Sequence, residues 1–107
     1  MKVLVTGAGA LLGQGIIKAL RASSLDPYVI AADPNPLSAG LYWADSAHLI
    51  GMANAPDYLD SVRAVIAAEK PDVVLVGTDV ELPVFAANRA ALEAGGDVVD
   101  RGEAEEL

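Results

Sequence analysis

The residues of this 107-residue chain that could do chemistry are glycines and carboxylates that follow short hydrophobic runs. Gly7, Gly9 and Gly13 follow the first run with a G-x-G-x-x-x-G spacing, one residue longer than the G-x-G-x-x-G of dinucleotide-binding loops. Such glycines permit a tight turn close to a ligand, but packing a helix on a sheet needs glycines at the same place, so both interpretations stay open. The candidate binding residues of this loop are Gly7, Ala8, Gly9, Gly13 and Gln14.

Asp33 ends the second hydrophobic run and precedes Pro34-Asn35-Pro36. Dinucleotide-binding domains place an acid here that accepts hydrogen bonds from a ribose hydroxyl. The other interpretation is an Asx turn, since aspartate often opens a proline-rich turn. Asn35 in the same turn is a further candidate for ligand contact.

Two more carboxylates, Asp79 and Glu81, precede a predicted helix. Together they could bind an amine or ammonium group, although acids are common at helix starts for capping and dipole reasons alone. We expect Asp33 and Glu81 to face a cleft, to be largely reachable from the surface and to contact substrate. An amide at either position should then change stability by under about 1 kcal/mol.

Composition excludes several other chemistries. The chain has no cysteine and one histidine, His48, so it offers no thiolate nucleophile, no disulfide and no cysteine or multi-histidine metal site. We interpret His48 as structural. We predict no catalytic residue and no metal site.

Tyr42 and Trp43 could form a lid, but a local anchor for their long loop is the preferred interpretation.

Charge and hydropathy limit the partners. Seven Lys and Arg residues against fifteen Asp and Glu give a formal net charge of -8, which disfavours a phosphate-backbone partner. No apolar run approaches the roughly 20 residues of a membrane-spanning helix, and no signal peptide is recognisable. We therefore expect a cytoplasmic protein that binds neither nucleic acid nor membrane.

Strand and helix patterns alternate along the chain, with Leu12, Ile16 and Leu20 forming the apolar line of the first helix. Alternation at this spacing predicts a single α/β domain with a doubly wound, Rossmann-like parallel sheet over residues 1–99. Residues 100–107 are expected to be an acidic tail or a truncation boundary. Strands are predicted at 2–6, 28–32, 48–50, 72–77 and 97–99, helices at about 12–22, 55–70 and 83–95 with Gly95 as the last C-terminal cap, and a long loop at 33–46.

In such sheets, ligands bind beyond the carboxyl ends of the strands. The chain segments that follow the first four strands should therefore converge on one site. This places the glycine loop, the turn after Asp33, the residues around Gly51 and the segment 77–81 together.

Seven short segments, in their order and spacing, carry a family resemblance that covers nearly all of residues 1–99. With them, the chain resembles the N-terminal pre-ATP-grasp domain of ATP-grasp ligases, particularly the carbamoyl-phosphate-synthase-like members. The segments are Val3-Leu4-Val5-Thr6-Gly7-Ala8-Gly9, Gly13-Gln14-Gly15-Ile16, Asp33-Pro34-Asn35-Pro36, Gly40-Leu41-Tyr42 with Ala44-Asp45, Pro56-Asp57-Tyr58, Pro71-Asp72-Val73, and Gly77-Thr78-Asp79-Val80-Glu81-Leu82.

The resemblance implies that the complete enzyme uses ATP and Mg²⁺ to activate a carboxylate as an acyl phosphate, which an amine or ammonia attacks. It also implies that an ATP-grasp domain, in cis or as a separate subunit, holds the nucleotide and magnesium. This chain would contribute substrate contacts from Gly7–Gln14, Asp33–Asn35 and Asp79–Glu81. Alone, we expect it to be inactive and to bind no cofactor tightly.

Two alternatives remain. Thr6-Gly7 and Asp33 also fit an NAD(P)-binding module of a reductase or epimerase, and a titration with NADH would discriminate this from the ligase interpretation. The third candidate is a regulatory module without catalysis.

Overall fold

Strands and helices alternate in a computed structural model that describes residues 1–93 and 98–99. Predicted features at Gly95, Asp97 and residues 100–107 lie outside this described part. The strands are β1 (Lys2–Thr6), β2 (Tyr28–Asp33), β3 (Ser46–Leu49), β4 (Val73–Val76) and β5 (Val98–Val99), and the helices are α1 (Leu11–Ala22), α2 (Ala39–Tyr42), α3 (Tyr58–Glu69), α4 (Leu82–Ala87) and α5 (Arg89–Glu93).

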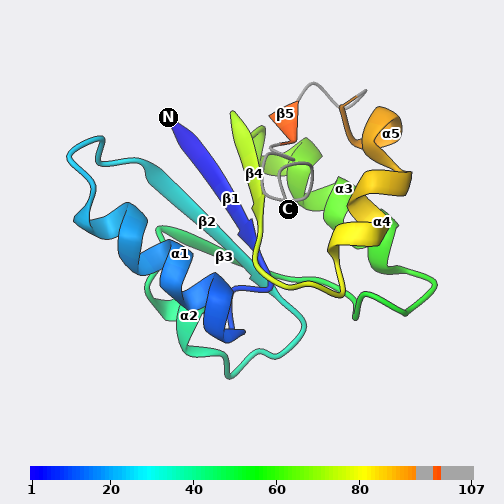
Figure 1. Ribbon diagram of the computed structural model, residues 1–107, viewed down its shortest axis with the longest axis horizontal. Coiled ribbons are helices and arrows are strands. Elements are labelled where there is room, and N and C mark those ends of the chain that lie inside the picture. The colour runs from blue at the N-terminus through cyan, green and yellow to red at the C-terminus, as the bar shows by residue number, and fades with distance from the viewer. Residues whose placement is uncertain (94–97, 100–107) are drawn as a thin grey trace.

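The strands form one parallel sheet in the order β3-β2-β1-β4-β5. The chain moves outward from β1 to β3 and then crosses back to β4, so strand order reverses between β1 and β4. Helices α1 and α2 cover one face of the sheet, and α3, α4 and α5 cover the other (Figure 1). This arrangement confirms the predicted doubly wound α/β fold, and it creates the strand-order reversal at which such folds bind ligands.

A hydrophobic cluster lies on each face of the sheet. Leu4 faces the side of α3 and α4, where it belongs to the same cluster as Tyr58 and Phe85. Val3 and Val5 face the other side and belong to the cluster that contains Ile17 of α1. Because successive side chains of a strand point to opposite faces, the continuous apolar run of β1 is buried on both sides, as its composition predicted.

Helix α1 is packed differently from its expected apolar line. Gly13 and Ile17 are its buried residues, whereas Leu12 is 54% exposed. A Cβ atom at Gly13 would overlap the carbonyl oxygen of Gly7, so the helix approaches the end of β1 through its glycine. That close approach turns Leu12 toward the solvent, and the prediction for Leu12 was wrong.

Three element boundaries also differ from prediction. The loop at 33–46 contains the short helix α2, and β3 begins at Ser46 rather than at His48. The helix expected from Pro83 to Gly95 is interrupted at Asn88, whose side-chain amide donates to the carbonyl of Val84 at 2.8 Å. Local bonding by asparagine competes with helix propagation, which accounts for the break.

Helix α3 agrees well with its pattern. It begins at Tyr58 instead of about residue 55, and it buries Val62 and Ile66, with Leu59 partly buried. It ends at Glu69, and the next residue, Lys70, has a left-handed φ of 51° just before Pro71. None of the helices in the described part of the chain has the length and apolarity needed to cross a bilayer.

Candidate functional site

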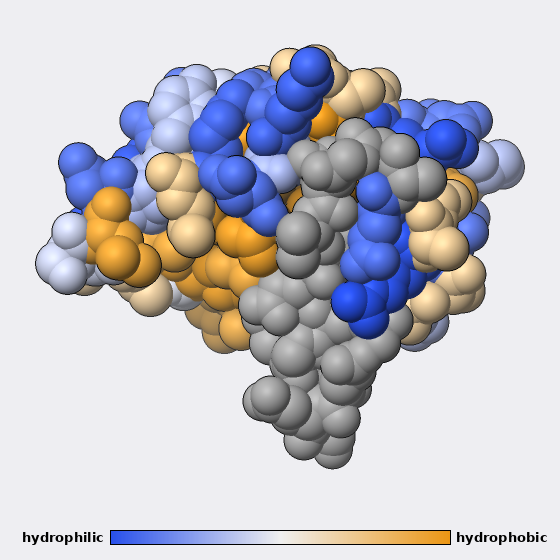
Figure 2. All heavy atoms as spheres, turned by 90° about the horizontal axis from the view of Figure 1, so that it is seen from above, coloured by the Kyte–Doolittle hydropathy of each residue, from blue (hydrophilic) through white to orange (hydrophobic). Residues whose placement is uncertain are grey.

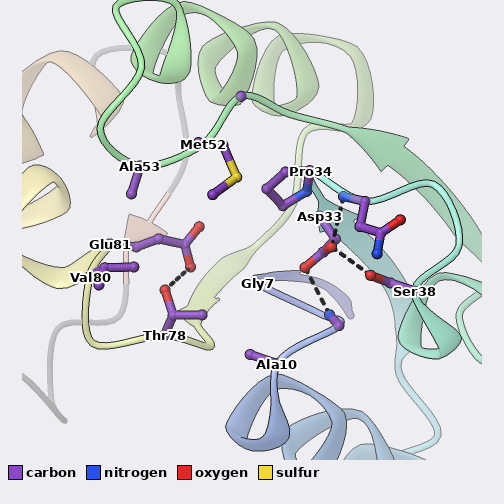
Figure 3. A pocket seen from close by; sticks show the side chains of 13 residues that line it. Gly7, Ala10, Asp33, Pro34, Ser38, Met52, Ala53, Thr78, Val80 and Glu81 are labelled. Atoms are coloured by element: carbon purple, nitrogen blue, oxygen red, sulfur yellow. Dashed lines mark hydrogen bonds between the residues drawn. The ribbon is translucent and has the colours of Figure 1, made fainter.

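A cavity of about 330 Å³ opens at the carboxyl ends of the strands, and we call it the strand-end cavity. Loops after β1, β2, β3 and β4 all contribute to it, as expected from the parallel topology (Figure 3). Figure 2 views the opposite edge, where the strands begin and where hydrophilic and hydrophobic surface lie side by side. The lining residues are Gly7, Gly9, Ala10, Asp33, Pro34, Asn35, Ser38, Gly51, Met52, Ala53, Thr78, Val80 and Glu81.

Glu81 lies on one wall of this cavity and is only 4% exposed. Its Oε1 accepts a hydrogen bond from the Tyr58 hydroxyl at 2.7 Å. Its Oε2 accepts from the Thr78 hydroxyl at 2.8 Å and the Thr6 hydroxyl at 3.2 Å. Although Glu81 stands at the N-cap position of α4, its side chain makes no capping hydrogen bond. The carboxylate therefore accepts hydrogen bonds from a cluster of three hydroxyls and does not cap its own helix.

Burial raises the pKa of Glu81, and the charge of Asp33 raises it further, while the three hydroxyl donors act in the opposite direction. Burial, followed by the charge of Glu81, strongly raises the pKa of Tyr58, so its hydroxyl keeps its proton and remains a donor. The arrangement holds a carboxylate inside the protein with its charge compensated by neutral donors.

Asp33 lies on the opposite wall, facing Glu81 across the cavity (Figure 3). Its Oδ1 accepts from the Gly9 amide at 2.9 Å, and its Oδ2 accepts from the Asn35 amide at 3.0 Å and the Ser38 hydroxyl at 2.6 Å. The bond from the amide two residues ahead is an Asx turn, which was one of the two interpretations. Two donors from the loop after β2 and one from the glycine loop thus occupy the carboxylate of Asp33.

The expected accessibility of Asp33 and Glu81 was wrong. Both line the cavity, but they are 6% and 4% exposed. Each carboxylate gathers donors both from its own loop and from distant segments of the sequence, and those donors cover it. An amide at either position would therefore disturb a buried network, so the expectation of a change under about 1 kcal/mol does not apply.

The glycine loop uses its own amide groups internally. The N–H of Ala8 donates to the carbonyl of Ala32 at 3.1 Å, and the N–H of Ala10 donates to that of Gly7 at 3.0 Å. The N–H of Gly9 is bound to Asp33. Gly7 has a φ of 61°, which favours glycine, and a Cβ at Gly9 would overlap Ser38. These contacts support the packing interpretation of the loop, since the amides of Ala8, Gly9 and Ala10 are already engaged within the protein.

The nine residues predicted to bind ligand separate into two groups. Gly7, Gly9, Asp33, Asn35 and Glu81 line the strand-end cavity. The other four do not line it: Ala8 is buried in the core, Gly13 lies against Gly7, Gln14 donates to the carbonyl of Gly9 at 2.7 Å, and Asp79 is exposed.

Sequence reasoning missed the donors around the carboxylates, Thr6, Ser38, Tyr58 and Thr78. Thr6 and Thr78 are adjacent to Gly7 and Gly77, the glycines that follow β1 and β4. This position at the strand ends could have indicated that their hydroxyls lie at the site. Tyr58 gave none, because its pairing with Glu81 spans 23 residues and depends on how α3 packs.

No Lys, Arg or His lines the strand-end cavity in the described part of the chain. Two carboxylates without a cation repel a triphosphate, and the amides of Ala8, Gly9 and Ala10 in the glycine loop already have acceptors within the protein. These residues therefore do not fit ATP. Within the same described residues, no group of three or more His, Cys, Asp or Glu side chains could hold a metal ion.

Two other singled-out residues lie outside the cavity. His48 Nε2 is 2.7 Å from Glu69 Oε2, which agrees with a structural interpretation. Trp43 is covered by Lys18, whose Nζ lies 5.0 Å from the ring centroid, and its carbonyl accepts from Arg21 at 2.8 Å. These contacts support its role as a local anchor.

Sheet order, layering and the position of the cavity define a Rossmann-like α/β domain. The sequence matches the family described as "PylC-like, N-terminal domain" over residues 3–99, and the chain belongs to this family, a pre-ATP-grasp domain of ATP-grasp ligases. This bears out the resemblance found in the sequence. A search of curated proteins gave no match.

Two solved structures illustrate the fold. Glycinamide-RNase-transformylase T from Mycobacterium tuberculosis is 21% identical with a TM-score of 0.67, over 92% of this chain and 28% of that one. dTDP-glucose 4,6-dehydratase from Bacillus anthracis str. Ames, in complex with NAD, is 19% identical with a TM-score of 0.51, over 82% of this chain and 30% of that one. At these identities the likeness concerns the fold alone. The chain spans less than a third of either protein.

Proposed function

We propose that this chain is the substrate-binding N-terminal domain of a larger ATP-grasp ligase of the carbamoyl-phosphate-synthase-like kind. The ligase would join a carboxylate to an amine or ammonia. In this proposal, an ATP-grasp domain, in cis or as a separate subunit, holds ATP and Mg²⁺, and the strand-end cavity receives the amine. Family membership supports the ligase part of the proposal.

The observation that carries the amine part is the charge of the cavity. Glu81 and Asp33 stand on opposite walls, both buried, and the lining residues include no basic side chain. An ammonium group in this space would be attracted by both carboxylates in a medium of reduced dielectric constant, whereas a carboxylate or phosphate would be repelled. The site therefore selects a cation of small size.

A titration of the ¹⁵N-labelled chain tests this proposal. Methylammonium chloride should shift the amide signals of Gly7, Gly9 and Thr78, whereas sodium acetate at equal ionic strength should not. Asp79→Asn removes an exposed carboxylate that does not line the cavity, and it should bind methylammonium like the parent. Acetate shifting the same signals as strongly as methylammonium would refute the proposal.

The NAD(P)-binding alternative is not favoured. Its two supports were the glycine loop and Asp33, and the Gly9 amide and the Asp33 carboxylate are bonded to each other. The diphosphate of NAD(P) would be repelled by the two cavity carboxylates, since no basic side chain lines the cavity in the described part of the chain. We expect a titration with NADH to leave the cavity signals unchanged, and shifts at Gly7 and Asp33 would restore this alternative.

A further inference from the structure

A second hollow, of about 250 Å³, adjoins the strand-end cavity. We call it the apolar hollow. It shares Met52, Ala53 and Val80 with the cavity and adds Asn54. Figure 3 shows these three shared side chains gathered on the wall that carries Glu81. A ligand bound at Glu81 could therefore extend into the apolar hollow without leaving the protein surface.

The walls of the apolar hollow are hydrophobic and exposed. Met52 is 59% exposed and Val80 is 70% exposed, while Ala53 packs against the core beneath them. Covering such side chains with an apolar group is favourable, because apolar surface is removed from water. A carboxylate beside an apolar surface is a combination that fits a molecule with a cationic head and an apolar body.

Hydrogen bonds hold the loop that carries Met52 in place. The Gly51 amide donates to the Ser61 hydroxyl at 3.0 Å, and the Ala55 amide donates to the Met52 carbonyl at 2.9 Å. The Ser61 hydroxyl in turn donates to the carbonyl of Tyr58 at 2.7 Å. The hydroxyl of the same Tyr58 donates to Glu81, so one residue helps to hold both the loop and the carboxylate, and a ligand would find both in a preformed arrangement.

We propose that the amine bound in the strand-end cavity is a primary amine with an apolar chain of several carbon atoms, its ammonium group at Glu81 and its chain along Met52, Ala53 and Val80. This inference rests on the proposed function and specifies its substrate class. Met52 and Val80 are then the residues that determine which amines bind.

A series of alkylammonium ions tests the proposal. Methyl-, propyl- and pentylammonium chloride are titrated into the ¹⁵N-labelled chain, with 1-pentanol as the neutral analogue of the longest ion. Each added methylene should tighten binding by about threefold to fourfold, the factor that its burial provides. Pentanol should bind more weakly than pentylammonium, because it lacks the charge that Glu81 attracts.

Three substitutions localise the effect. Met52→Ser and Val80→Ser should flatten the dependence of binding on chain length. Leu25→Ser is the matched control, since Leu25 is 75% exposed in the turn before β2 and lines neither hollow. Because all three side chains are exposed, the variants should fold like the parent, which their spectra will show.

The outcomes separate this inference from the function on which it rests. If methylammonium binds at the cavity but longer ions bind no better, the apolar hollow takes no substrate chain and the inference is overturned while the proposed function stands. A length dependence that survives in both Met52→Ser and Val80→Ser also overturns it. If no alkylammonium ion binds, the proposed function itself fails.

Discussion

At Glu81, hydroxyl groups from β1, from α3 and from the loop after β4 meet a single buried carboxylate. A buried charge is tolerated only when hydrogen bonds replace the water it has lost. The residues that supply these bonds, Thr6, Tyr58 and Thr78, come from three parts of the sequence. Glu81 therefore connects three parts of the fold through hydrogen bonds, and it also lines the cavity.

Removing the Glu81 carboxylate should lower the stability of the protein. We predict that Glu81→Ala lowers the free energy of unfolding by about 2 to 4 kcal/mol, because the buried hydroxyls of Thr6 and Tyr58 lose their acceptor. Glu81→Gln should cost less, since it keeps one acceptor oxygen and removes the buried charge. Urea unfolding followed by the fluorescence of Trp43, the one tryptophan, measures both.

Asp79→Ala is the control, because Asp79 lies two residues away and is exposed. It should change stability by less than about 0.5 kcal/mol. Equal losses in Glu81→Ala and Asp79→Ala would contradict the role assigned to the hydroxyl cluster.

At the scale of the element, α1 contains two glycines with different surroundings. A Cβ at Gly13 would overlap the carbonyl oxygen of Gly7, whereas a Cβ at Gly15 would meet no atom within 4 Å. Gly13 therefore lets the helix lie close to the end of β1, whereas Gly15 has open space around it.

The same substitution at these two glycines should therefore act in opposite directions. Gly13→Ala should destabilise the protein by about 1 to 3 kcal/mol, since backbone atoms must move apart. Gly15→Ala should stabilise it by about 0.5 to 1 kcal/mol, because alanine favours the helix more than glycine does. Thermal unfolding of both variants checks this, and a Gly13→Ala variant that melts like the parent would refute the close contact.

Glu69 links α3 to two strands. Its Oε2 accepts from the Ser46 hydroxyl at 2.8 Å and lies 2.7 Å from His48 Nε2, and its Oε1 lies 3.4 Å from Lys2 Nζ. The hydrogen bond with His48 is the main reason why the pKa of Glu69 is lowered from its ordinary value of 4.5, and the bond from Ser46 adds to it. The pH dependence of stability should report this link.

A carboxyl whose pKa is lowered by folding stabilises the protein above its unfolded pKa, and this contribution is lost as the pH falls through the folded value. The stabilisation from Glu69 should therefore be present above about pH 4.5 and disappear below it. We predict that Glu69→Gln removes part of the acid-induced loss of stability, measured by urea unfolding between pH 3 and pH 7. Asp60→Asn, an exposed change on the same helix, should leave that loss intact.

Glu81 should show the opposite behaviour, because folding raises its pKa. Its charge costs stability at neutral pH, and this cost is relieved as the pH falls through the folded value toward 4.5. The two acids thus act in separate pH ranges, Glu81 above 4.5 and Glu69 below it. A loss of stability in Glu69→Gln that is the same at every pH would contradict this assignment.

At the scale of the whole molecule, the described part of the domain provides a cavity lined by two buried carboxylates and no group that grips a triphosphate. We predict that the 107-residue chain alone neither hydrolyses ATP nor releases ADP in the presence of Mg²⁺. The amides of Ala8, Gly9 and Ala10 are bonded internally, and among the described residues the cavity lining contains two carboxylates and no basic side chain. A coupled assay for ADP checks this, and release that scales with the concentration of the chain would overturn it.

Much of the architecture could be read from local patterns. The continuous apolar run of β1, the turn at Asp33 and the end of α3 before Pro71 are all where the sequence placed them. Each depends on residues close together in the chain, namely hydrophobic periodicity, proline geometry and Asx bonding. The convergence of four strand-end loops on one site followed from parallel topology alone.

Tertiary structure alone decided how the site residues behave. The bond between Tyr58 and Glu81, the bond from the Gly9 amide to Asp33 and the bond from the Thr6 hydroxyl to Glu81 all join residues more than 20 positions apart. A sequence pattern marks which residues end a strand, but the exposure and hydrogen bonding of a side chain depend on which distant groups are packed against it. For this reason the sequence determined the family, the sheet and the place of the cavity, while packing decided that its two carboxylates are buried and bonded within the protein.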